Sequence, residues 1–243
     1  MSVKHPEFVP DPSLSRGEME QLQRDIAATA IFEDDTEIDP TTAIIAGVDQ
    51  AFLDDETAVS AIVLMRNGAV IEKVYAISPV EIPYIPGLLS FREGRSILDA
   101  FEKLELTPDL IMFDGSGRIH FREAGIATHI GVTLDVPSIG VAKSLLCGHP
   151  TGSLDGLPEG ARVPIEADDS VTAPAGELIG YAVQTRQYPN SMKINPLYVS
   201  AGHRVSAETA ADLVAATATE YKLPEPTRLA DNYAAEVKRT TDS

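Results

Sequence analysis

Residues 109–114 read DLIMFD, a short apolar run that ends in an acid and is followed at once by Gly115-Ser116-Gly117. A run of this length bounded by turn residues is typical of a buried β-strand. The next segment, FREAGIATHIGVTLD (121–135), has helical composition, and PSIGVAK (137–143) again favours a strand. A strand, a helix and a strand in succession predict two parallel strands joined by a right-handed crossover. We therefore expect an α/β fold.

Three further strands are expected before this unit. AIIAGVD (43–49) is another apolar run, with Asp49 at its C-terminal end. Two runs rich in β-branched residues, 58–66 and 69–77, flank Asn67-Gly68. Because Asn-Gly favours a tight hairpin turn, these two strands should be antiparallel neighbours. Together with the parallel unit, they predict a mixed β-sheet.

The stretch PYIPGLLSFRE (83–93) combines a stiff turn with the start of a helix. Each of its prolines fixes its own φ and pushes the preceding residue toward extended geometry, so Tyr84-Ile85 should form a rigid knuckle. Ser90 and Glu93 fit the S-x-x-E pattern of a capping box, and an apolar stripe continues beyond them. A rigid hydrophobic tip on a helix start is suited to insertion into a partner.

The remaining elements follow from the same signals. Ser15 and Glu18 form another capping-box pattern, which predicts an amphipathic helix over 16–31. Residues 148–177 show no periodicity and should be mostly irregular. The later elements are expected as strands over 177–185 and 195–205, followed by a helix capped by Ser206.

The chain shows no internal repeat and no change of composition, so we expect a single domain. It should consist of a flexible N-terminal arm (1–12), the folded domain (13–232) and a C-terminal tail (233–243). The N-terminus is Pro-rich and polar, unlike a signal peptide, and no apolar run approaches the ~18 residues that cross a bilayer. A lone cysteine, Cys147, fits a reducing interior. We expect a cytoplasmic monomer that contacts no membrane.

Acids outnumber bases 37 to 19, which gives a formal net charge of −18. The acids cluster at 33–39, 54–56 and 166–169, where we expect a solvated surface without a binding role. Taken alone, this charge argues against nucleic-acid binding because it repels phosphate. It is also the composition that keeps proteins soluble in concentrated salt, where repulsion is screened within a few Å. We infer a halophilic source.

Three predicted element boundaries carry acids: Asp49, Glu93 and Asp114. Sites in α/β sheets form at the carboxyl ends of strands, and carboxylates that converge there repel one another unless a divalent cation joins them. Oxygen ligands favour Mg²⁺ or Mn²⁺. Each acid also has a structural explanation, as a turn residue or a helix cap. His120 could serve as a general base, and Lys143 could neutralise a phosphate.

Taken together, these segments resemble the endonuclease V family of deoxyinosine-directed nucleases. The resemblance spans residues 43–231 and is most specific in PYIPGLLSFRE. It implies an RNase H-like fold, with a mixed central sheet flanked by helices. It also implies Mg²⁺-dependent hydrolysis of the second phosphodiester bond 3′ to the lesion, leaving 3′-hydroxyl and 5′-phosphate ends. The segments that carry it are, in order, IAGVD, PYIPGLLSFRE, DGSGRIH, IGVAKSLLCG, GHRVS and EPTRLAD.

The resemblance also implies roles for individual residues. Metal binding falls to Asp49, Glu93 and Asp114, and catalysis to these three with His120 and Lys143. The DNA wedge would be Pro83, Tyr84, Ile85 and Pro86. The pocket for hypoxanthine would be lined by Gly87, Leu89, Gly115, Gly117, Ile126 and Leu146. Two positions depart from the family pattern: Phe121 stands where proline is common, and Ser116 where a bulkier polar residue is usual.

The acidic surface demands that positive charge be concentrated where DNA would bind. We therefore expect one basic face around the site, formed by Arg92, Arg95, Arg118, Arg122, Lys143, Lys193, Arg204 and Arg228. Two alternatives to a DNA repair endonuclease stay open: a non-catalytic module that recognises inosine, and a ribonuclease for inosine-containing RNA. A pure binding module would gain nothing from acids that face phosphate.

Overall fold

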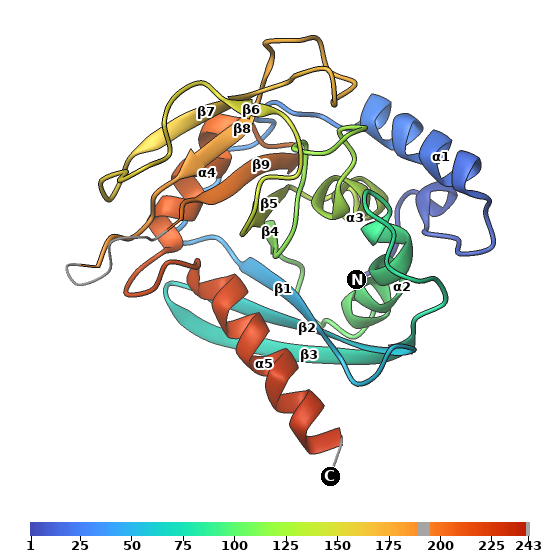
Figure 1. The fold of residues 1–243 in the computed structure, drawn as a ribbon. Helices are drawn as coiled ribbons and strands as arrows, with labels where there is room; N and C mark the ends of the chain where they lie inside the picture. Colours follow the sequence, from blue (N-terminus) through green and yellow to red (C-terminus); the bar gives the residue numbers. More distant parts are fainter. Residues whose placement is uncertain (189–194, 242–243) are drawn as a thin grey trace.

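The computed structural model describes residues 1–188 and 195–241, and none of the helices in these ranges is long and apolar enough to span a bilayer. Their strands form one nine-stranded sheet in the order β3-β2-β1-β4-β5-β9-β8-β7-β6 (Figure 1). The strands are β1 (Ile45–Phe52), β2 (Thr57–Arg66), β3 (Ala69–Pro79), β4 (Leu110–Phe113), β5 (Ser138–Ala142), β6 (His149–Pro150), β7 (Arg162–Glu166), β8 (Leu178–Val183) and β9 (Leu197–His203). The helices are η1 (Pro6–Phe8), α1 (Arg16–Thr29), α2 (Leu89–Phe101), α3 (Ile126–Leu134), α4 (Ala207–Thr217) and α5 (Glu225–Thr241).

The centre of the sheet is parallel and its flanks are antiparallel. Strand β4 pairs in parallel with β1 and with β5, whereas the other neighbours run antiparallel. The pairing of β1 with β4 ends at Val48 and Phe113, but β1 continues along β2 to Phe52. The expected α/β domain with a mixed central sheet is confirmed.

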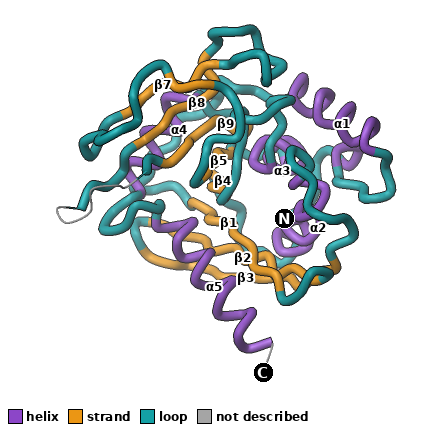
Figure 2. Tube along the Cα trace, in the orientation of Figure 1, coloured by secondary structure: helices purple, strands orange, loops and turns teal. Residues whose placement is uncertain are grey.

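Helices cover both faces of this sheet (Figures 1 and 2). Helices α2 and α3 pack on one face, with α1 outside α3, and α4 and α5 pack on the other. Successive side chains of a strand point to opposite faces, so Ala46 joins the core beneath α2, whereas Ile45 joins the core beneath α4. Both cores consist mainly of aliphatic and aromatic side chains, which hold the central strands in place.

Several local signals are confirmed. Asn67 and Gly68 both have positive φ, 50° and 73°, as a two-residue hairpin turn requires. Ser15 caps α1 in a complete capping box with Glu18. Ser206 accepts a hydrogen bond from the Thr209 amide and caps α4.

Two expectations about the acids are wrong in detail. Ser90 does not cap α2, whose N-cap residue is Leu88, because the Ser90 hydroxyl is bonded to His129 Nδ1 at 2.8 Å. Asp49 lies inside β1 rather than at its end, since β2 extends the pairing beyond β4. Asp49 is still the first residue after the parallel pairing stops.

Two segments also differ in length. Only the second half of 121–135 is helical, because Gly125 approaches the Ser116 backbone so closely that a Cβ would lie 2.3 Å from Ser116 O. Within 148–177, an irregular segment was expected, but β6 and β7 extend the edge of the sheet. Strand β7 is short and half exposed, so its sequence shows no clear alternation of apolar and polar residues.

The segments near both ends of the described chain, up to residue 241, pack against the domain. The Met1 amino group donates to Phe101 O at 2.7 Å, and Phe8 is buried, so the N-terminal segment is not a loose arm. Residues 233–241, expected as part of a tail, complete α5, where Ala234 and Val237 are buried. The buried side of this helix uses small residues, which give only a weak apolar pattern.

The acidic segment 33–39 makes specific contacts instead of forming only a solvated linker. Asp34 accepts hydrogen bonds from Ser206 and Thr209 at the start of α4. Asp35 forms an ion pair with Arg204. Part of the negative charge therefore holds the segment before β1 against the domain.

Candidate active site

Asp49 and Asp114 lie side by side at the carboxyl ends of the parallel strands. The Asp114 amide donates to Val48 O at 3.1 Å, which fixes the two acids on neighbouring strands at the same level. Their convergence follows from the topology, since β1 and β4 are parallel neighbours. Sites in α/β sheets form at this edge.

The two carboxyls influence each other strongly. Burial, followed by the negative charge of Asp114, raises the pKa of Asp49 to about 8. The Gln50 amide partly opposes this by donating to Asp49 Oδ1 at 2.8 Å. The pair is therefore held together against electrostatic repulsion, which a cation would relieve.

Glu93 approaches the same edge from the opposite side of the sheet. It lies on α2, and the Gln50 side chain donates to its backbone carbonyl at 3.1 Å. Burial raises the pKa of Glu93 to about 7; Arg92 opposes the shift and Asp114 adds to it. The Glu93 carboxyl can therefore exchange a proton near neutral pH.

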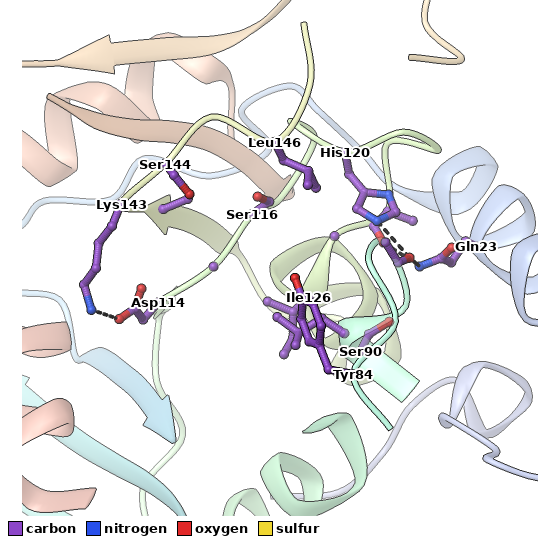
Figure 3. Close-up of a pocket in the computed structure, with 16 residues that line it drawn as sticks. Gln23, Tyr84, Ser90, Asp114, Ser116, His120, Ile126, Lys143, Ser144 and Leu146 are labelled. Atoms are coloured by element: carbon purple, nitrogen blue, oxygen red, sulfur yellow. Dashed lines mark hydrogen bonds and ion pairs between the residues drawn. The ribbon is translucent and has the colours of Figure 1, made fainter. Parts of the chain in front are cut away.

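Lys143 follows β5, and its side chain points to Asp114, as Figure 3 shows. Its Nζ lies 2.5 Å from Asp114 Oδ2. Burial alone would lower the pKa of Lys143, but its hydrogen bond to Asp114 and the nearby negative charges raise it. The ammonium group therefore stays charged and lies beside the acids.

A further acid, Asp231, belongs to this cluster and was missed from the sequence. It lies on α5, close enough to Asp49 to help raise the pKa of that carboxyl. The start of α5 can lie close to β1 because Gly47 of β1 has no side chain. A Cβ at Gly47 would lie 1.9 Å from Pro226 O. The signal available in the sequence was the acid that closes the motif EPTRLAD.

The chemistry of these side chains fits a divalent cation. In the described ranges, no group of three His, Cys, Asp or Glu side chains is already arranged as a metal site. Asp114 and Asp231 nevertheless both raise the pKa of Asp49, and Lys143 interacts electrostatically with all three acids. Oxygen donors of this kind suit Mg²⁺ or Mn²⁺.

A pocket of about 280 Å³ opens directly beside the acids (Figure 3). Asp114 and Lys143 form one end of its lining and His120 and Gln23 the other. Five of the six residues expected in a base pocket line it: Gly87, Leu89, Gly115, Ile126 and Leu146. Gly115 leaves the pocket open, since a Cβ there would lie 2.7 Å from Ile126 Cγ2.

Gly117, the sixth residue expected in the pocket, is not part of its lining. Its amide donates to Ser200 Oγ at 3.0 Å, and a Cβ would lie 2.2 Å from Ala201 O. Gly117 instead lets the loop after β4 pack against β9. Because Gly115 and Ser116 line the pocket and directly precede Gly117, the packing of Gly117 against β9 fixes the position of that part of the lining.

His120 lies at the end of the pocket away from Asp114. The Arg122 amide donates to His120 Nδ1 at 3.2 Å, so the proton is on Nε2, which donates to Gly87 O at 3.1 Å. Burial lowers the pKa of His120 to about 4, so the ring is neutral. Because both ring nitrogens are occupied by backbone groups, the contacts favour a role in shaping the pocket over the expected role beside the attacking water.

The expected wedge lies at the rim of the pocket. Tyr84 is 65% exposed and lines the opening, whereas Ile85 packs partly against α1 and α2. Pro83 and Pro86 are exposed on either side of them. An exposed ring on a proline-stiffened turn is available for insertion into a partner.

The expected single basic face is wrong. Arg204 lies in a cleft with Pro108 and Pro137, which precede β4 and β5, so it is at the edge of the sheet opposite Asp114. Arg228 pairs with Glu225 near the start of β1. Carboxylates are so abundant on this chain that several arginines serve as ion-pair partners. Arg95 and Arg118 are likewise paired with acids, and Lys193 lies outside the described residues.

Comparisons with known proteins agree with this geometry. The family model for endonuclease V matches residues 22–232. Endonuclease V from Haloarcula marismortui is 62% identical over 265 residues, covering 98% of this chain and 97% of that protein. The protein of the same name from Natronomonas pharaonis is 60% identical, covering 98% of each chain. These relatives come from halophilic organisms.

Solved structures show the same fold. Endonuclease V from Streptomyces avermitilis has a TM-score of 0.82 and 30% identity over the whole of both chains. That of Ciona intestinalis, solved with a 24mer DNA containing an inosine followed by a ribo-adenosine, has a TM-score of 0.76 and 25% identity, covering 93% of this chain and 98% of that one. With the family model spanning nearly the whole domain, the chain belongs to the endonuclease V family of nucleases.

Proposed function

We propose that this protein is a DNA repair endonuclease that recognises deoxyinosine. It hydrolyses the second phosphodiester bond 3′ to the lesion in a Mg²⁺-dependent reaction and leaves 3′-hydroxyl and 5′-phosphate ends. The observation that carries the proposal is the continuity of the pocket with the acids: Asp114 and Lys143 line one end of the same cavity that Gly87, Gly115 and Ile126 line further in. A base held there brings its own strand to the carboxylates. The inosine-containing DNA bound by the Ciona protein supports this substrate.

Base extrusion is the first requirement. An enzyme that reads a base from its edges must take it out of the stack, which costs a few kcal/mol, least for a weakly paired base. Tyr84 stands exposed at the rim of the pocket. Its stiff turn limits the entropy lost on insertion, and its ring can stack in the gap that the base leaves.

Discrimination against adenine follows from the pocket wall. Hypoxanthine presents a 6-oxo acceptor and an N1–H donor, where adenine has an amino group and a bare nitrogen. Gly115 lines the pocket without a side chain of its own, so backbone groups next to it could approach the base. Adenine would leave such groups unpaired at a cost of about 1–3 kcal/mol each.

Hydrolysis is assigned to the carboxylate cluster. Asp49 and Asp114, assisted by Asp231 and Glu93, would hold Mg²⁺, which when bound supplies charge neutralisation and Lewis acidity. Lys143 keeps its proton and can neutralise the phosphate oxygens as charge builds up. Burial raises the pKa of Glu93 to about 7, so binding of Mg²⁺ at this carboxyl would release the proton that it partly holds at neutral pH.

The test is cleavage of a deoxyinosine oligonucleotide labelled at each end, beside an otherwise identical deoxyadenosine strand. With Mg²⁺ in molar KCl we expect one cut, at the second bond 3′ to the lesion, and no cut with EDTA. Absence of cleavage with Mg²⁺ and with Mn²⁺ would reject the proposal. Metal-independent binding without cleavage would select the non-catalytic inosine-binding alternative.

An inosine-specific ribonuclease is the second candidate. The observation that favours it is the ribo-adenosine after the inosine in the DNA bound by the Ciona protein. Strands carrying deoxyadenosine or ribo-adenosine at that position separate the two activities. Much faster cleavage of the ribo-containing strand would favour RNA as the substrate.

A further inference from the structure

The carbonyl oxygen of Gly87 is a point where three side chains meet. Gln23 Nε2 donates to it at 2.9 Å, His120 Nε2 at 3.1 Å and an Arg122 terminal nitrogen at 3.2 Å. Gly87 directly follows the PYIP turn and has a φ of 80°, a conformation that favours glycine. The residue that ends the wedge turn is therefore fixed by contacts from two other parts of the chain.

Gln23 connects these contacts. Its side chain is 1% exposed, and its oxygen accepts from Arg122 Nε at 2.7 Å. Its amide also reaches Ala124 O at 3.4 Å. Every polar atom of this buried amide therefore has a partner, and the partners lie in the wedge turn and in the loop before α3. Figure 3 shows Gln23 and His120 together at the end of the pocket opposite Asp114.

The position of Gln23 on its helix is unusual for a polar residue. It occupies the buried side of α1 together with Met19 and Ile26, one turn on either side. An apolar residue would serve packing better there, because burying an amide costs free energy unless all its hydrogen bonds are made. The polar residue is needed only if Gly87 and Arg122 must be held.

We infer that Gln23 is a positioning residue that fixes the PYIP wedge relative to the pocket. This inference rests on the proposed function, because it assumes that the wedge fills the gap left by an extruded base. The hydrogen bonds of Gln23 go to Gly87, Ala124 and Arg122 and not to the carboxylates of the cluster, so it acts through the wedge turn and the loop before α3. Helix α1 thereby becomes part of the machinery for base extrusion.

The inference predicts a specific dependence on substrate. A wedge is needed where the base must leave a stacked, paired duplex, and is needed less in a single strand, where the base is already unstacked. Loosening the wedge should therefore lower kcat/KM for an inosine·cytosine duplex more than for a single strand. A residue that merely stabilises the fold would lower both equally.

The experiment compares Gln23→Met with wild type on these two substrates. We expect the ratio of kcat/KM for duplex over single strand to fall about tenfold, which corresponds to about 1.4 kcal/mol. This ratio does not depend on the fraction of active enzyme, so partial unfolding cannot imitate the result. Gln23→Glu, which keeps the acceptor for Arg122 but places an oxygen against Gly87 O, should lower the ratio as well and serves if the methionine variant does not fold.

Gln21→Met is the matched control. Gln21 lies on the exposed side of the same helix, and its hydrogen bonds go to neighbours within that helix. The ratio of kcat/KM for duplex over single strand should therefore be the same in Gln21→Met as in wild type. An equal loss on both substrates, or no loss, in the Gln23 variants would overturn the inference. If wild type cleaves neither substrate, the proposed function itself fails, which is a distinct outcome.

A second readout reports on the wedge directly. The chain contains no tryptophan, so Tyr84→Trp places its one tryptophan at the tip, where it can be excited selectively over the tyrosines. Adding Gln23→Met to that variant should lower the fluorescence anisotropy of the tip, because the turn is held less firmly. Unchanged anisotropy would contradict a positioning role.

Discussion

At the scale of single residues, the buried histidine His129 connects the N-terminal segment to the pocket. Its Nε2 donates to Phe8 O at 2.8 Å, and its Nδ1 accepts from the Ser90 hydroxyl at 2.8 Å. Since a carbonyl can only accept, the tautomer is fixed, and the ring must be neutral to keep both bonds. Burial accordingly lowers the pKa of His129 to about 4.

This arrangement predicts a dependence of stability on pH. A histidine with a lowered folded-state pKa contributes stability above its ordinary pKa of about 6.5, and that stability is lost as the pH falls toward 4. The variant His129→Gln carries no titrating group at this position. Between pH 7 and 4.5, its free energy of unfolding should therefore fall by about 2 kcal/mol less than that of wild type. Urea unfolding at both pH values measures this. Equal losses in the two proteins would contradict it.

Individual residues also mark how far the sequence could predict the site. Asp49, Asp114 and Lys143 follow predicted strands, and strand ends converge in any parallel sheet, so their proximity was predictable. Gln23 and Asp231 were not, because their positions depend on how α1 and α5 pack. The capping pattern at Ser90 was misleading because Ser90 has a competing partner, His129, 39 residues further along the chain.

At the scale of elements, α5 completes the site from the far end of the chain. It packs across β1 and β2, and its start lies over Gly47. The hairpin and the central strands were predictable from turn residues and apolar runs. Helix α5 was not predicted, and its second half was expected as a tail, because its buried positions hold small residues that give a weak apolar pattern.

Gly47→Ala should therefore displace α5. A methyl group at this position would lie 1.9 Å from Pro226 O, and backbone cannot yield as a side chain can. We expect a loss of at least about 2 kcal/mol in the free energy of unfolding and a large loss of cleavage as Asp231 leaves Asp49.

The matched control for this substitution is Gly17→Ala on α1. A Cβ at Gly17 would have no heavy atom within 4 Å, so alanine should leave activity intact and slightly stabilise the helix. Thermal unfolding and cleavage rates of both variants decide the matter. A Gly47→Ala protein as stable and active as Gly17→Ala would refute the role given to α5.

At the scale of the whole molecule, the net charge of −18 is the dominant feature. Some of the carboxylates, such as those of Asp34 and Asp35, make specific hydrogen bonds or ion pairs. The remaining surface carboxylates repel one another. The Debye length falls from about 10 Å at 0.1 M salt to about 3 Å at 1 M, so concentrated salt removes most of this repulsion. The same screening would let phosphate approach the acids.

We expect the thermal unfolding midpoint to rise between 0.1 M and 2 M KCl. Neutralising three exposed acids in the triple variant Asp55→Asn, Glu105→Gln and Asp169→Asn should reduce that rise, since less repulsion then remains to be screened. A midpoint that is the same at both salt concentrations, or a variant with the full salt effect, would show that surface repulsion is not the cause.

The central claim is that acids from distant parts of the chain form one cutting site beside the base pocket. The most direct measurement follows cleavage and binding of a deoxyinosine strand by wild type, Asp49→Asn and Asp114→Asn. We predict that Mg²⁺ supports cleavage by wild type only, with both variants slower by about 10³-fold or more while they still bind the strand. Variants that cut at nearly the wild-type rate would contradict the account.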